Sequence, residues 1–277
     1  RRGARRIGAR QGPLASQRAD AMTRTRHPRR SRAPGPALQL LESRAWFEAG
    51  ASLALMPVWR LAPRGDGHPV LVLPGLAASD DSTAILRGFL RSLGYRAYGW
   101  GQGRNLGFRP GVLGAVRQRL VQLAGEHGRK VSLIGWSLGG IFARELAKEV
   151  PHSVRMVITL ASPFTGHPRA TNAFRLYEWM SGHRIGAPQV HEPLRAPPPV
   201  PTTSIWSRSD GVVSWRCSVE RDLPLVENIE INASHFGIGA HPLALYAIAD
   251  RLAQPEGRWR PFERNGWKAV VYGTGAR

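Results

Sequence analysis

The stretch that most constrains this chain is 135–140, which reads Gly-Trp-Ser-Leu-Gly-Gly. The residues just before it, 130–134, are mostly apolar and have the length of a buried strand. The residues after it, 141–150, carry apolar side chains at helical spacing and end before Pro151. A G-x-S-x-G motif between a strand and a helix is typical of a strained turn that presents the serine hydroxyl above a sheet. We therefore expect a strand–turn–helix unit with Ser137 at its corner.

The glycines of this motif have a physical reason. In so tight a turn, a side chain two residues before or after the serine would collide with neighbouring backbone. The helix behind Ser137 also directs its N-terminal N–H groups and the positive end of its dipole at the same place. The plainer alternative is a glycine-rich turn that happens to contain an ordinary serine.

The rest of the chain alternates strand-like and helix-like stretches. Strands are expected at 69–73, 95–100, 130–134, 154–160, 203–206 and 228–231, and helices at 81–93, 112–126, 141–150 and 242–252. Asp81 and Ser82 are expected to cap the first of these helices. This alternation predicts an α/β fold with a doubly wound, mostly parallel sheet, in which ligands bind at the carboxyl ends of the strands.

The expected domain organisation is a single α/β domain at 37–262, between a disordered basic tail at 1–36 and an irregular tail at 263–277. The alternation breaks at 163–202, which we interpret as a cap insertion. A short helix beginning near Asn172 would carry several aromatic residues there. These could cover an apolar pocket or simply fill the core, and the sequence favours neither.

The formal net charge of +20 would suit a nucleic-acid-binding protein, but its distribution argues against one. Residues 1–35 hold 11 Arg and a single acidic residue, Asp20, so half of the excess lies in a segment too poor in large apolar residues to order itself. Arg also greatly outnumbers Lys across the whole chain, which indicates a general compositional bias. We expect no nucleic-acid partner.

Residues 38–55 have the pattern of an amphipathic helix, with Leu41, Trp46 and Leu53 among its apolar positions. Such a helix could lie on a membrane surface, but we expect it to pack across the edge of the sheet. No stretch has the length and hydropathy of a membrane span, and Cys217 is the single cysteine, so the sequence predicts no internal disulfide and a cytoplasmic location.

A serine nucleophile needs a base to take its proton and a carboxylate to orient that base. In a sheet of this type the order along the chain is serine, acid, histidine, each just after a strand. Asp210 and His235 fit that order and position. The alternatives are Asp222, Glu227 and Glu230 for the acid, and His241, His167, His183 and His191 for the base. His183 and His191 lack accompanying ligands at metal-binding spacing, so no metal is expected.

An oxyanion formed at Ser137 would need two backbone donors. One should be the N–H of Leu138, directly after the nucleophile, and the other the N–H of Leu76, in the turn after the first core strand. The glycine-rich loop 101–107 fails the dinucleotide-binding spacing G-x-G-x-x-G, so no nucleotide cofactor is expected.

The stretches 70–76, 135–140, 209–213 and 234–237 together resemble the α/β-hydrolase superfamily, and within it the bacterial lipase and esterase branch. The resemblance implies a Ser137–Asp210–His235 triad, no cofactor, and esters of apolar acids as substrates. Lipases of that branch usually carry His at the position of Trp136 and His-Gly at Pro74-Gly75, a departure that argues against long-chain triglycerides. Two alternatives to an esterase remain: an acyltransferase that uses the same triad, and a non-catalytic protein of this fold that binds a ligand or a membrane.

Overall fold

A computed structural model describes residues 32–55, 57–165, 171 and 195–272. The basic tail before residue 32, the expected helix at Asn172 and the three histidines His167, His183 and His191 lie outside the described residues. No helix in the described part of the chain is both long and apolar enough to cross a membrane.

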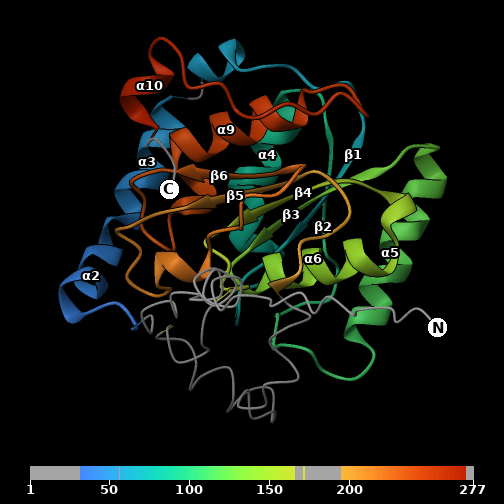
Figure 1. Cartoon of the computed structure of the whole chain (residues 1–277), viewed down its shortest axis with the longest axis horizontal. Coiled ribbons are helices and arrows are strands. Elements are labelled where there is room, and N and C mark those ends of the chain that lie inside the picture. Colours follow the sequence, from blue (N-terminus) through green and yellow to red (C-terminus); the bar gives the residue numbers. More distant parts are fainter. Residues whose placement is uncertain (1–31, 56, 166–170, 172–194, 273–277) are drawn as a thin grey trace, which may run out of the picture. The chain divides into compact units, whose positions relative to one another are not determined.

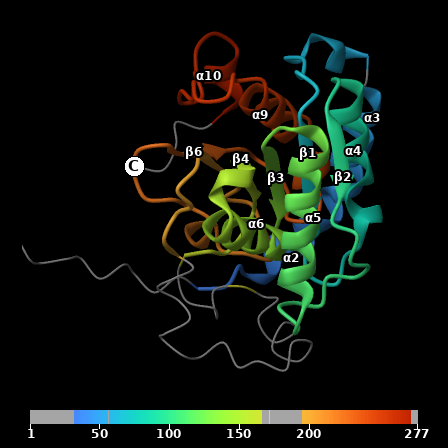
Figure 2. The same ribbon diagram turned by 90° about the vertical axis from the view of Figure 1, so that its right-hand side faces the viewer.

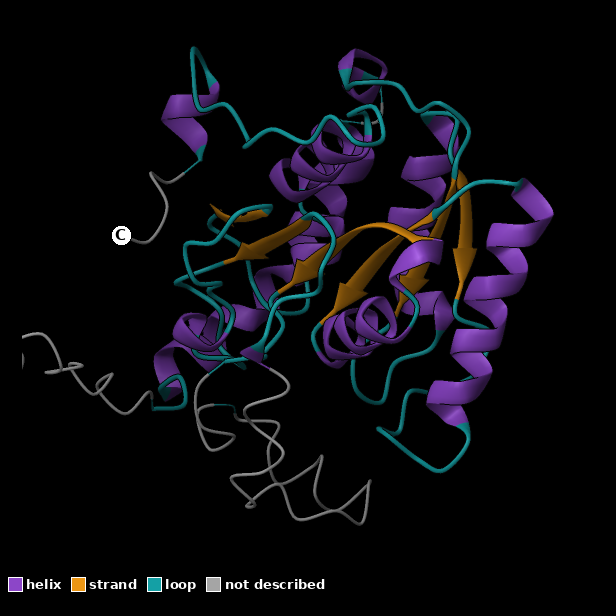
Figure 3. Ribbon diagram, turned by 45° about the vertical axis from the view of Figure 1, so that its right-hand side comes forward, coloured by secondary structure: helices purple, strands orange, loops and turns teal. Residues whose placement is uncertain are grey.

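The described residues form one six-stranded sheet with the strand order β2-β1-β3-β4-β5-β6 (Figures 1 and 3). Every neighbouring pair of strands is parallel, as the alternation of elements predicted. The strands are β1 (Pro69–Leu73), β2 (Arg96–Gly99), β3 (Val131–Trp136), β4 (Val154–Leu160), β5 (Thr202–Trp206) and β6 (Val226–Glu230). The central strands β1 and β4 are buried along their whole length, because helices cover both faces of the sheet.

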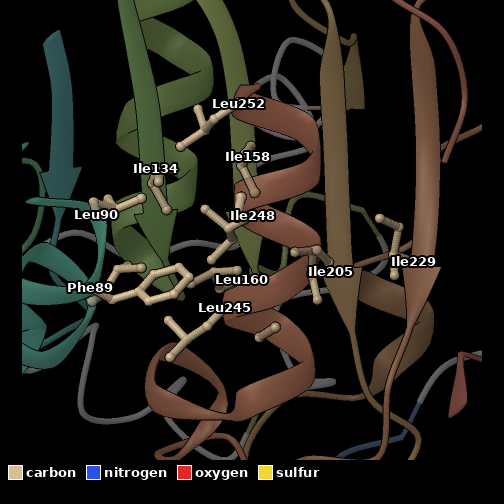
Figure 4. Packing of buried hydrophobic residues seen from close by; sticks show 14 of the residues in the cluster. Phe89, Leu90, Ile134, Ile158, Leu160, Ile205, Ile229, Leu245, Ile248 and Leu252 are labelled. Carbon is tan, nitrogen blue, oxygen red and sulfur yellow. The ribbon is translucent and has the colours of Figure 1, made fainter. Parts of the chain in front are cut away.

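Two layers of helices cover the sheet (Figures 1 and 2). On one face lie α4 (Ala84–Ser92) and α9 (Pro242–Leu252), whose apolar residues pack on β1, β3, β4 and β5. Figure 4 shows this packing against Ile134 of β3, Ile158 and Leu160 of β4, and Ile205 of β5. On the other face lie α5 (Val112–His127) and α6 (Leu138–Glu149), which enclose a second apolar cluster. Two buried cores on opposite sides of one sheet are what a doubly wound fold requires.

The strand order reverses direction between β1 and β3. From β1 the chain moves outward to the edge strand β2, then returns past β1 to β3 and continues the other way to β6. Neighbouring strands whose connections leave in opposite directions create a crevice at their carboxyl ends. The turn at Leu76 follows β1 and Ser137 follows β3, so both lie at this crevice.

The N-terminal segment differs from the single amphipathic helix that the sequence predicted. It consists of α2 (Pro36–Leu40), the 3₁₀ turn η1 (Leu41–Arg44) and α3 (Ala45–Ala54). Its expected core positions face outward: Trp46 is 84% exposed and Leu53 53% exposed. The buried side chains are instead Glu42, Glu48 and Ser52. The segment does contact the domain, but through its polar face.

The start of one further helix differs from expectation. The helix before β2 begins with the 3₁₀ turn η3 (Asp80–Thr83), and its cap is Ser79, whose hydroxyl accepts from the N–H of Asp81; Asp81 and Ser82 are not the cap. Shorter 3₁₀ turns complete the connections: η2 (Val58–Leu61), η4 (Pro151–Ser153), η6 (Trp215–Cys217) and η7 (Ile238–Ala240).

The C-terminal residues make more contacts than an irregular tail would. They include the short helix α10 (Lys268–Val271), and Tyr272 is buried directly after it. The Tyr272 hydroxyl donates to the backbone carbonyl of Leu243 at 2.8 Å, and its ring packs edge-on against Phe262. This part of the chain therefore belongs to the core beside α9, beyond the expected boundary at residue 262.

Candidate active site

Ser137 occupies a strained turn between β3 and α6. Its φ of 53° lies in the left-handed region, which side chains other than glycine rarely adopt. The flanking glycines allow the turn to close. A Cβ on Gly135 would lie 2.3 Å from the carbonyl oxygen of Gly139, and one on Gly139 would lie 2.3 Å from the carbonyl oxygen of Leu73. The backbone is thus strained at Ser137, and close packing of the neighbouring backbone at Gly135 and Gly139 maintains this conformation.

The structure brings Ser137, His235 and Asp210 together into a hydrogen-bonded chain. His235 Nε2 lies 3.1 Å from Ser137 Oγ, and His235 Nδ1 lies 2.7 Å from Asp210 Oδ2. Both His235 and Asp210 are 3% exposed. Because an ionised carboxylate can only accept, Nδ1 carries the ring proton and Nε2 presents its lone pair to the serine hydroxyl. In the sequence, His235 lies 98 positions after Ser137 and 25 positions after Asp210.

The carboxylate of Asp210 is fixed by its own loop. Its second oxygen, Oδ1, accepts from the backbone N–H groups of Val212 at 2.8 Å and Val213 at 2.7 Å. The first oxygen is therefore left to face His235 in one orientation. The loop begins directly after β5, as the sequence predicted for the acid.

The environment of His235 makes it a stronger base than an ordinary histidine. Burial alone would lower its pKa, but the charge and hydrogen bond of Asp210, together with the charge of Glu42, raise the pKa above its usual value. A raised pKa favours the imidazolium form, which is the form that a base adopts after it takes a proton.

The two expected oxyanion donors lie at the same crevice. Leu138 is the first residue of α6, and neither its N–H nor that of Leu76 has a protein acceptor among the described residues. The turn at Leu76 comes close to the nucleophile, since a Cβ on Gly75 would lie 3.4 Å from Ser137 Cβ. Buried Asn105 supports the turn: its amide donates to the carbonyl of Pro74 at 2.8 Å. No motif or spacing in the sequence singles out Asn105.

The described alternatives to the acid and the base have other partners. His241 caps α9, where its Nδ1 accepts from the N–H of Leu243 at 3.2 Å. Glu227 pairs with Arg251, Glu230 pairs with Arg208, and Asp222 is exposed in a loop. Among the described residues no group of three His, Cys, Asp or Glu side chains has the geometry of a metal site.

A second Asp–His–Ser chain lies at the opposite, amino-terminal edge of the sheet. His68 Nδ1 is 2.5 Å from Asp66 Oδ1, and His68 Nε2 is 2.8 Å from Ser132 Oγ. His68 and Ser132 are completely buried, so no substrate can reach this hydroxyl. Ser132 also lies within β3 rather than on a strained turn. Its place in the fold makes this chain a structural network between β1 and β3.

Comparison with known proteins finds similarity at the level of the fold. No protein-family model matches the sequence, and no curated protein sequence matches it significantly. Aspergillus fumigatus lipase B is 19% identical with a TM-score of 0.53; the match covers 68% of this chain but only 52% of that lipase, so this chain spans about half its length. The monoacylglycerol lipase of Paleococcus ferrophilus is 16% identical with a TM-score of 0.50, and the match covers 68% of this chain and 96% of that one. With its parallel sheet and the turn at Ser137, this likeness shows that the chain has the α/β-hydrolase fold.

Proposed function

We propose that this chain is a serine hydrolase that cleaves carboxylic esters through an acyl-enzyme on Ser137. The observation that carries the proposal is the hydrogen-bonded chain from Asp210 through His235 to Ser137, with the serine on a strained turn at the switch point of the sheet. A general base 3.1 Å from a hydroxyl, itself oriented by a buried carboxylate, is the arrangement that activates a serine nucleophile.

In the acylation step, Ser137 Oγ forms a bond to the carbonyl carbon of the ester while His235 Nε2 takes the hydroxyl proton. The carbonyl electron pair moves onto its oxygen, and the N–H groups of Leu76 and Leu138 are in position to bind the resulting oxyanion. When the oxyanion collapses, the bond to the alcohol oxygen breaks and His235 gives that oxygen its proton. Asp210 stabilises the imidazolium throughout this step.

Deacylation repeats the same sequence with water in place of Ser137. His235 takes a proton from water as the water oxygen bonds to the acyl carbon. When the second oxyanion collapses, the bond from the acyl carbon to Ser137 Oγ breaks, His235 gives its proton to Oγ, and the carboxylic acid leaves. His235 thus takes and returns one proton in each half of the reaction, so Ser137, His235 and Asp210 with the two backbone donors suffice for both halves.

Esters are the substrate class to test first. Solved structures that share the fold include proteins named as lipases, and the exposed edge of the site carries apolar Phe236, which is 59% exposed. An exposed aromatic ring beside His235 suits an acyl chain better than a charged group. The departures at Trp136 and at Pro74-Gly75 remain our reason to expect substrates other than long-chain triglycerides.

Pre-steady-state hydrolysis of p-nitrophenyl esters of graded acyl length tests this proposal. We expect a burst of about one equivalent of p-nitrophenol when deacylation limits turnover, and its loss in Ser137→Ala. Ser132→Ala, in the buried network, is the matched control and should keep the activity. Adding methanol distinguishes the acyltransferase alternative, for which methyl ester would replace free acid as the main product. Turnover that survives Ser137→Ala would overturn the assignment of the nucleophile.

A further inference from the structure

The polar face of the N-terminal segment, residues 36–54, lies against the two loops that carry Asp210 and His235. The segment buries Glu42 and Glu48 while it leaves Trp46 and Phe47 more than four-fifths exposed, at 84% and 81%. A helix that buries carboxylates and exposes aromatic rings is the reverse of an ordinary surface helix. The buried carboxylates must therefore have specific partners.

Glu42 binds both triad loops through their backbone. Its Oε1 accepts from the N–H of Gly211 at 2.7 Å and from the N–H of His235 at 2.9 Å, and its Oε2 accepts from the N–H of Phe236 at 3.0 Å. Burial of a carboxylate is unfavourable unless hydrogen bonds replace its water, and here three backbone donors do so. One side chain thus joins the residue after the acid to the base itself.

Two neighbouring residues of the segment, Arg44 and Glu48, make further hydrogen bonds to the same loops. Glu48 accepts from the N–H of Ser234 at 2.8 Å and from its hydroxyl at 2.5 Å. Arg44 forms an ion pair with Glu48 at 3.1 Å and donates to the carbonyl of Ser209 at 3.2 Å. Each triad loop is therefore also bound by the segment at a residue shortly before the point that Glu42 binds, Ser209 in one loop and Ser234 in the other.

Two glycines in the loops show how closely the segment approaches. A Cβ on Gly211 would lie 2.3 Å from the carbonyl oxygen of Leu38, and a Cβ on Gly237 would overlap the Glu48 carboxylate. Neither glycine has a positive φ, so close approach rather than backbone conformation explains the absence of a side chain at both positions. The sequence of the loops is thus fitted to the presence of this segment.

We propose that Glu42 is a positioning residue of the active site, whose carboxylate fixes the spacing and orientation of Asp210 and His235 by binding the backbone of both loops. The inference rests on the proposed function for its catalytic consequence. Its structural part, that Glu42 holds the two loops in place, is independent of any turnover.

The charge of Glu42 gives the inference a second readout. The charges that act on the His235 ring are those of Asp210 and Glu42, while the Arg44–Glu48 pair binds the neighbouring backbone. Both carboxylates favour the imidazolium and raise its pKa. Removing the Glu42 charge should therefore lower the pKa of His235 and move the acid limb of the rate profile to lower pH.

Glu42→Gln and Glu42→Asp in the full chain separate position from charge. In Glu42→Gln we expect kcat to fall on the order of 10- to 100-fold with little change in KM, and the acid limb to move to lower pH. Glu42→Asp keeps the charge but shortens the side chain, so its kcat should fall while its acid limb stays in place. Phe47→Ser, on the exposed side of α3, is the control and should match the unaltered protein in kcat and in the position of the acid limb.

Amide hydrogen exchange provides the readout that does not need activity. We expect faster exchange at Gly211, His235 and Phe236 in both Glu42 variants, with the β3 and β4 amides unchanged. Unchanged exchange at these three amides in folded Glu42→Gln, or an active Glu42→Gln with the original kcat and pH profile, would overturn the inference. Absence of ester hydrolysis in the unaltered protein would instead contradict the proposed function. The exchange experiment would still test whether Glu42 holds the two loops in place.

Discussion

The indole N–H of Trp136 donates a hydrogen bond to the backbone carbonyl of His235 at 3.0 Å. Trp136, the residue before Ser137, thus binds the backbone carbonyl of His235, while Glu42 binds the backbone N–H of the same residue. A Cβ on Gly75 would lie 3.2 Å from the Trp136 ring, so the indole also lies against the turn that presents Leu76. Trp136 therefore precedes Ser137 directly and contacts both His235 and the turn at Leu76.

Replacing Trp136 by Phe should keep the ring in place and remove this hydrogen bond. Loss of a bond to a buried carbonyl costs about 1 kcal/mol, so we expect kcat for ester hydrolysis to fall about 5-fold with KM nearly unchanged. Trp267→Phe, on the half-exposed C-terminal segment, is the matched control. An undiminished kcat in Trp136→Phe would show that the carbonyl of His235 needs no anchor.

Asp210→Asn tests the orientation of the base. The amide oxygen can still accept from Val212 and Val213, which leaves the amide nitrogen, a donor, to face His235 Nδ1. The ring would then carry its proton on Nε2, toward the serine, and we expect kcat to fall about 10⁴-fold. Asp222→Asn removes an exposed acid as the control. If Asp210→Asn stays active while Glu227→Gln or Glu230→Gln does not, the acid has been assigned wrongly.

The pH dependence of kcat/KM follows from the raised pKa of His235. In the proposed mechanism His235 acts as a base only when neutral, so activity should rise with pH as the imidazolium loses its proton. Since burial is outweighed by Asp210 and Glu42, the midpoint of this acid limb should lie above 6.5, the ordinary histidine value. A profile measured between pH 5 and 9 with a neutral ester checks it, and a midpoint below 6.5 would show that burial dominates instead.

Acid stability should depend on the buried network at the other edge of the sheet. Burial lowers the pKa of His68 to about 4, although the hydrogen bond and the charge of Asp66 act to raise it. Between pH 6.5 and 4 the unfolded chain binds a proton at this residue and the folded chain does not, so the free energy of unfolding should fall by about 3 kcal/mol over that range.

Urea unfolding at several pH values measures this slope. His68→Gln removes the titrating group and should flatten the decline between pH 6.5 and 4, whereas His152→Gln, an exposed histidine, should not. A decline that is equally steep in His68→Gln would assign the acid sensitivity to other groups.

The buried ion pair between Arg144 of α6 and Glu220 should be important for folding. Both side chains are almost fully buried, and Arg144 also donates to the carbonyl of Ala196 at 3.1 Å and lies over the Phe164 ring at 3.9 Å. Glu220→Gln would leave the guanidinium buried beside a neutral partner, and we expect a loss of about 3–5 kcal/mol in unfolding free energy. Glu145→Gln removes a half-buried partner of Lys148 and should cost less than about 1 kcal/mol.

The core of the fold could be predicted because its central strands β1, β3 and β4 are mostly apolar and alternate with stretches of helical periodicity. The strand at 154–160 and the helix at 242–252 have the bounds expected from the sequence. The start of the helix expected at 81–93 was wrong. Ser79, two residues earlier, caps the 3₁₀ turn η3, which has no apolar periodicity of its own.

The three residues that the structure places together were predictable from their order and their positions after strands. The role of Glu42 was not, because the periodicity of its segment pointed to Leu41 and Trp46 as the buried side, and both are exposed. Periodicity locates an apolar face but does not say which face is buried. The glycines at 211 and 237 were the available signal, since a glycine after a functional residue can indicate close approach by another segment.

Labelling by a fluorophosphonate probe, followed by mass spectrometry of the labelled peptide, tests the central claim most directly. Such a probe reacts with a serine hydroxyl only when a neighbouring base activates it. We predict one adduct per chain on Ser137, retained in Ser132→Ala and lost in Ser137→Ala and in His235→Ala. A chain that stays unlabelled, or that is labelled equally well when Ser137 is replaced by Ala, would contradict the claim that this serine is an activated nucleophile.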